Sequence, residues 1–96
     1  VIARYLSAVR LQLEAVKRYP ALARRRGSTG TAMLFIVIDR DGRPAKVQVK
    51  RSSGSELLDE EAQDMVARAA PFDPLPTEVE RDSLQLTIPV RFDVDS

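Results

Sequence analysis

Residues 31–50 read TAMLFIVIDRDGRPAKVQVK and predict a β-hairpin. Residues 31–39 are rich in β-branched and aromatic side chains, which favour strands. Residues 45–50 alternate Ala45, Val47 and Val49 with polar side chains, as a strand with one buried face does. Between the two segments, the pair Asp41-Gly42 accepts the positive φ of a tight turn. Two antiparallel strands are therefore expected here.

A third strand is predicted at the other end of the chain. Residues 84–94 read LQLTIPVRFDV, with an apolar side chain at every second position from Leu84 to Val94. Pro89 lacks an N–H and cannot donate to a neighbouring strand, so this strand is expected at a sheet edge. We place it beside the first strand, which gives the order 2-1-3.

Two amphipathic helices flank the hairpin. Pro20 ends the first helix and Pro71 ends the second, because a residue before proline is pushed out of helical geometry. Between Pro20 and the hairpin, residues 21–26 predict one further turn with Gly27 as its left-handed cap. The apolar faces of the two helices are Ile2, Leu6, Val9, Leu13 and Val16, and Leu58, Ala62, Met65 and Ala69.

The remaining residues of the helical regions are interpreted as polar surface or connector. The outer face of the first helix is expected to carry Arg4, Arg10, Gln12, Glu14 and Lys17, and Glu60, Glu61 and Asp64 are read as a solvated face of the second. Residues 71–83 contain three prolines and are expected to form an ordered connector packed by Phe72 and Leu75. The predicted fold class is α+β, with two helices packed on one face of a three-stranded antiparallel sheet.

Composition narrows the function classes. The 96 residues predict a single domain spanning residues 1–96. The chain has no Cys and no His, so the usual zinc ligands and nucleophile pairs are missing, and we expect no enzyme, no metal site and no cofactor. Ser52 and Ser53 have no histidine to activate them as nucleophiles. Asp39 and Asp41 are assigned to the hairpin turn and not to a metal site. A net charge of +1 argues against a nucleic-acid binder.

One face of the first strand is unusually apolar. If Ala32 and its alternate neighbours face the helices, then Met33, Phe35 and Val37 line the opposite face, where polar residues are expected. Either the stems of Lys46 and Lys50 cover this face, or it marks a second contact such as a homodimer. The sequence leaves both interpretations open.

The order and spacing of several short motifs resemble the C-terminal domain of the TonB family. The resemblance extends over residues 5–94. The motifs are Tyr19-Pro20, Arg26-Gly27-Ser28-Thr29-Gly30-Thr31, Ile38-Asp39 before Arg40-Asp41-Gly42-Arg43, Val47-x-Val49 before Ser52-Ser53-Gly54, Leu58-Asp59, Ala70-Pro71-Phe72 and Ile88-Pro89-Val90-Arg91-Phe92.

The resemblance implies a periplasmic domain of an inner-membrane-anchored protein in a Gram-negative bacterium. Such proteins work with ExbB and ExbD through an N-terminal membrane helix, which, with a Pro-rich linker, is not among these residues. They bind the TonB box of outer-membrane receptors and transmit energy from the proton-motive force for uptake of siderophores, haem or similar nutrients. An alternative is a TolA-like or other envelope scaffold domain that binds periplasmic proteins.

The residues themselves suggest how a partner would bind. A long edge strand is a template for pairing with another chain. We therefore expect an extended receptor segment to lie along the last strand, with the Tyr-Pro motif flanking its end. The predicted partner-binding residues are Arg18, Tyr19, Pro20, Leu86, Thr87, Ile88, Pro89, Val90, Arg91 and Phe92.

Overall fold

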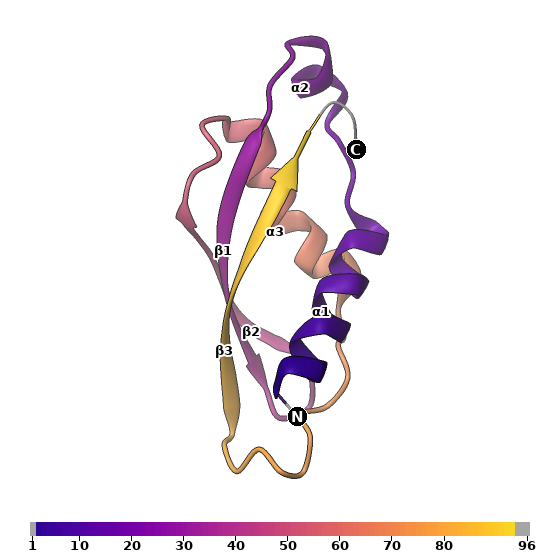
Figure 1. Cartoon of the computed structure of the whole chain (residues 1–96), viewed down its shortest axis with the longest axis vertical. Helices are drawn as coiled ribbons and strands as arrows, with labels where there is room; N and C mark the ends of the chain where they lie inside the picture. Colours follow the sequence, from indigo (N-terminus) through magenta and orange to yellow (C-terminus); the bar gives the residue numbers. More distant parts are fainter. Residues whose placement is uncertain (1, 94–96) are drawn as a thin grey trace.

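The computed structural model describes residues 2–93 and contains one three-stranded antiparallel sheet with the order β2-β1-β3 (Figure 1). The strands are β1 (Gly30–Asp39), β2 (Pro44–Arg51) and β3 (Ser83–Phe92). The predicted α+β class, the hairpin and the 2-1-3 order are confirmed. Val94, the predicted end of the last strand, lies outside the described residues.

The helices are α1 (Ile2–Val16), the short α2 (Ala21–Arg25) and α3 (Glu56–Ala69). The two long helices lie on one face of the sheet, and the domain is elongated, measuring 45 × 20 × 19 Å (Figure 1). Ser55 caps α3, since its side chain accepts a hydrogen bond from the Leu58 N–H. Gly27 has a φ of 69° and ends the α2 turn, as predicted.

The core lies between the sheet and the two long helices. On β1 the inward side chains are fully buried, and on β3 the alternate apolar side chains face the same way, as their periodicity predicts. The buried strand residues are Ala32, Leu34, Ile36, Ile38, Leu84, Leu86, Ile88, Val90 and Phe92.

The predicted inward face of α1 is wrong at its first turn. Ile2 is 50% exposed, whereas Tyr5 is buried with Val9 and Leu13. The Tyr5 hydroxyl donates to the Asp73 carbonyl at 2.7 Å. The buried side chains of α1 are therefore Tyr5, Val9 and Leu13, which lie four residues apart on one face of the helix. Gln12 was expected on the outer face, but its amide nitrogen donates to the carbonyls of Ala69 and Pro71 and joins α1 to the end of α3.

The hairpin turn packs against the connector. Gly42 has a φ of 92°, and its carbonyl accepts the Phe72 N–H at 2.8 Å. A Cβ at Gly42 would lie 2.1 Å from the Phe72 carbonyl oxygen, so the approach of the two segments requires glycine. Phe72 and Leu75 are buried, which confirms the predicted packing of the connector.

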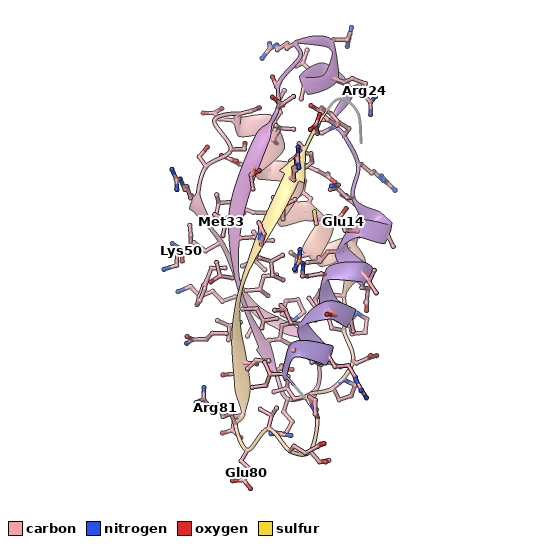
Figure 2. All side chains as sticks on the ribbon, viewed as in Figure 1. Glu14, Arg24, Met33, Lys50, Glu80 and Arg81 are labelled. Atoms are coloured by element: carbon pink, nitrogen blue, oxygen red, sulfur yellow. The ribbon has the colours of Figure 1, made fainter. Side chains whose placement is uncertain are left out.

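Lysine side chains cover part of the helix-free face of the sheet. Lys46 and Lys50 place their Nζ atoms 6.0 and 4.9 Å from the centroid of the Phe35 ring. Met33, Phe35 and Val37 are only partly exposed. Figure 2 labels Met33 and Lys50 on this part of the sheet. The first of the two interpretations is confirmed for Phe35, and the homodimer stays a prediction.

Candidate functional site

The sheet has two edges, and they differ in regularity. β3 pairs with β1 without interruption from Gly30 opposite Phe92 to Asp39 opposite Ser83. The pairing of β2 with β1 has two register shifts, and its helix-free face carries Lys46 and Lys50. Irregularities and lysines are devices that discourage pairing with another chain. The long, regular edge of β3 is therefore the better template for an added strand.

Two observations identify which main-chain groups of β3 point away from β1. In an antiparallel pair, the N–H and C=O of one residue point to the same side, and successive residues alternate. Pro89 has no N–H for the ladder, which favours the outward position. The Arg91 carbonyl, two residues on, accepts a hydrogen bond from the Lys17 ammonium at 2.7 Å. Thr87, Pro89 and Arg91 therefore direct their main-chain groups to the free edge.

The residues predicted on this strand fall into two sets. Leu86, Ile88, Val90 and Phe92 are at most 5% exposed, with side chains in the core and main-chain groups toward β1. The other three alternate with them and have exposed side chains. A segment added to this edge would thus contact Thr87, Pro89 and Arg91, whereas the buried side chains anchor the strand to the core.

The second predicted group lies in the connection between α1 and α2, beside the end of β3 (Figure 1). The Tyr19 ring meets the Phe92 ring edge to face, with centroids 5.8 Å apart. The Tyr19 hydroxyl donates to the Ser28 carbonyl. Arg18 is exposed, and Pro20 is partly buried at the start of α2. The structure therefore brings the Tyr-Pro motif and the last strand together.

Three charged residues at this position escaped the sequence prediction of the site. Lys17 pairs with Glu14 at 3.0 Å and lies 5.6 Å from the Phe92 centroid, in addition to its bond with the Arg91 carbonyl. The Arg24 guanidinium lies over the Tyr19 ring at 4.8 Å. The contacts of Lys17 with the Arg91 carbonyl and the Phe92 ring join residues far apart in the chain, so no local spacing could have indicated them.

Glu61 corrects the interpretation of α3 as a wholly solvated acidic face. Its side chain is only 8% exposed, accepts the Arg18 N–H at 2.7 Å and forms an ion pair with Arg68. Arg68 also donates to the Val16 carbonyl at 2.9 Å. The ion pair thus holds the segment that carries Tyr19. The available signal was position, because residue 61 lies three after Leu58 on the inward side of the helix.

Ser52 and Ser53 have a structural role. Both hydroxyls donate to the Asp59 carboxylate, and the Ser53 N–H donates to it at 2.9 Å. Burial raises the pKa of Asp59, but these hydrogen bonds outweigh burial, so the net pKa is lowered. Within residues 2–93, no three or more Asp or Glu side chains are grouped to hold a metal ion. No helix in the same range is long and apolar enough to cross a bilayer.

The profile of a protein family described as "Gram-negative bacterial TonB protein C-terminal" matches residues 15–94. The chain belongs to this TonB family. The predicted resemblance is thereby confirmed.

TonB proteins with curated descriptions show the same similarity. TonB of Pasteurella multocida is 34% identical over 88 residues, which cover 92% of this chain and 33% of that protein. Protein tonB2 of Pseudomonas aeruginosa is 48% identical over 50 residues, covering 52% of this chain and 18% of that protein. The chain therefore spans a third or less of the length of these relatives.

Solved structures share the fold. The solution structure of the Helicobacter pylori TonB C-terminal domain, residues 179–285 of that protein, superposes with a TM-score of 0.80 at 24% identity, covering 94% of this chain and 80% of that one. The HasB C-terminal domain superposes with a TM-score of 0.60 at 30% identity, covering 96% and 71%. The arrangement of two helices on the 2-1-3 sheet is thus the TonB C-terminal fold.

Proposed function

We propose that this TonB domain binds the TonB box of outer-membrane receptors as a fourth strand on the free edge of β3. In this role it transmits energy derived from the proton-motive force to receptors for siderophores, haem or similar nutrients. The observation that carries the proposal is the uninterrupted β3 edge with Arg91 presenting its carbonyl away from β1. The domain acts in the periplasm, and ExbB and ExbD act on a part of the protein outside this chain.

Recognition through main-chain groups suits a domain that serves several receptors. The outward groups within residues 87–91 are the N–H and C=O of Thr87 and Arg91 and the C=O of Pro89. Main-chain hydrogen bonds supply affinity in strand addition and place few demands on side-chain identity. The inward side chains of β3 are buried in the core and cannot contact a bound segment. The domain therefore recognises the segment by its shape and by its ends.

The Tyr19-Pro20 motif and Arg18 flank the end of this edge. Tyr19 is fixed by its contact with Phe92 and its bond to the Ser28 carbonyl, so its ring forms a rigid wall at the end of the added strand. The Arg18 side chain is exposed, and its main-chain N–H donates to Glu61. This cluster gives the bound segment a defined end point.

The geometry is suited to carrying force. Hydrogen bonds between paired strands lie across the strand direction, so a pull along the strand loads them together. A peptide bound with modest affinity can therefore resist a lengthwise pull. The long axis of the domain, 45 Å against about 20 Å across, follows the strands (Figure 1). We infer that tension enters and leaves along this axis.

The proposal is tested by hydrogen exchange and amide chemical shifts of the isotope-labelled domain, with a synthetic TonB-box peptide and a scrambled control. The outward amides of Thr87 and Arg91 should exchange quickly in the free domain and become protected when the peptide binds. The amides of Ile88 and Val90, already bonded to β1, should change little in exchange. The proposal would be refuted if the protected amides lay on β2, or if the scrambled peptide protected the same amides as the TonB-box peptide.

A further inference from the structure

An open hollow lies at the end of the β3 edge. It has a volume of about 310 Å³ and is lined by Glu14, Lys17, Tyr19, Arg24 and Phe92. Its aromatic part is the Tyr19–Phe92 pair described above. Figure 2 labels Glu14 on α1 and Arg24 on α2, and both line the hollow together with Phe92 at the end of β3. A side chain near one end of an added strand would enter this hollow.

Lys17 occupies one of the acceptors that an added strand needs. Its Nζ donates to the Arg91 carbonyl at 2.7 Å, which is an outward group of β3. The lysine side chain is only 17% exposed and is held by Glu14 and the Phe92 ring as well. An incoming N–H can bond to this carbonyl only after the ammonium has moved aside. Lys17 therefore competes with the partner for the end of the edge.

The hollow also carries a positive charge that no ion pair within residues 2–93 compensates. The charge of Lys17 is balanced by Glu14 at 3.0 Å. Arg24 contacts the Tyr19 ring, and none of the ion pairs formed within residues 2–93 involves it. A carboxylate entering the hollow would meet the Arg24 guanidinium and the displaced Lys17 ammonium together. Two cations around an aromatic wall favour an acidic side chain over a neutral one.

We propose that this hollow is a subsite for an Asp or Glu side chain at one end of the bound segment, with Lys17 as an exchangeable latch. In the free domain Lys17 covers the Arg91 carbonyl; in the complex it releases the carbonyl and pairs with the incoming carboxylate. The inference rests on the proposed addition to β3 and goes beyond it, because it specifies the chemistry of the partner. Arg24 and Lys17 are the selecting residues, and Glu14 opposes the incoming charge.

The test uses one TonB-box peptide in three forms: Glu at the amino end, Glu at the carboxyl end, and Gln at both. Binding is measured by isothermal titration at low salt. One Glu form is expected to bind the unaltered domain about three- to five-fold more tightly than the Gln form. The preference should fall in Arg24→Gln, where only Lys17 is left to pair with the carboxylate, and persist in full in Arg25→Gln, a neighbouring arginine outside the hollow. Lys17→Met should bind the Gln form about three-fold more tightly, since the carbonyl is no longer covered.

Each contrary result has a distinct meaning. If all three peptides bind equally well and still protect the Thr87 amide, the subsite is refuted while the proposed function stands. A Glu preference that is undiminished in Arg24→Gln places the selection elsewhere and also refutes the subsite. If Lys17→Met fails to tighten binding of the Gln form, the latch is refuted. If no form binds, the proposed function fails and the subsite with it. Matching amide spectra establish that each variant is folded.

Discussion

Replacement of Glu61 by Ala is expected to lower the free energy of unfolding by about 2 to 4 kcal/mol. The buried carboxylate of Glu61 pairs with Arg68 and accepts the Arg18 N–H at 2.7 Å. The same guanidinium donates to the Val16 carbonyl at 2.9 Å. The Glu61–Arg68 pair thus joins α3 to the end of α1 and to the segment that carries Tyr19.

The magnitude follows from what truncation leaves behind. Removal of one member of a buried ion pair costs about 3 to 5 kcal/mol, because the other charge stays without compensation. The Arg68 side chain is 27% exposed, so water recovers part of this cost. The Arg18 N–H loses its acceptor, which adds roughly 1 kcal/mol. The sum of these effects gives the range of about 2 to 4 kcal/mol.

Urea unfolding followed by circular dichroism measures the effect. For a domain of this size a slope of about 1 kcal/mol per M converts the loss to a midpoint shift of about 2 M or more. Glu60→Ala is the matched control, because its exposed side chain lies next along the same helix and should change stability by less than about 0.5 kcal/mol. Replacing Glu61 and Arg68 together with Met should recover much of the loss. Equal midpoints for Glu61→Ala and Glu60→Ala would refute the reasoning.

Two further predictions concern the hairpin and the start of α3. Gly42→Ala should cost about 2 kcal/mol or more, since it adds a steric clash with the Phe72 carbonyl to a positive φ, whereas Gly54→Ala, with a positive φ and open space, should cost about 1 kcal/mol in the same urea assay. The lowered pKa of Asp59 means that its carboxylate stabilises the fold above the unfolded pKa of about 4 and loses this effect as the pH falls through the folded value. Asp59→Asn should therefore flatten the fall of stability on the acid side of pH 4, and an unchanged pH profile would contradict this assignment.

Much of the fold could be predicted because periodicity and turn chemistry act locally. The alternation of β3, the Asp-Gly turn and Pro89 together indicated both the strands and their order. The buried face of α1 could not be predicted correctly at its first turn, since Ile2 and Tyr5 are both reasonable inward residues in an isolated helix. The hydrogen bond from Tyr5 to the distant Asp73 carbonyl decides between them, and it exists only in the folded chain.

The candidate site shows the same division. Tyr19 was found from a family resemblance and the last strand from its predicted edge position, and the structure brings them together through the Phe92 ring. Lys17 was read as part of a polar helix face, because nothing in the neighbouring residues points to the Arg91 carbonyl 74 positions away. A charged side chain that bonds to a distant main-chain group leaves no periodic signal in the sequence. The role of Lys17 could therefore be found only from the structure.

The most direct test of the account is peptide binding to the Thr87→Pro variant. Proline at this position removes an outward N–H and adds a ring to the free edge, while the ladder to β1 does not use that N–H. Thr87→Val keeps the N–H and is the control. With equal unfolding free energies, the account predicts that a fluorescent TonB-box peptide binds Thr87→Pro at least about ten-fold more weakly than Thr87→Val. Equal affinity for the two folded variants would contradict strand addition at β3.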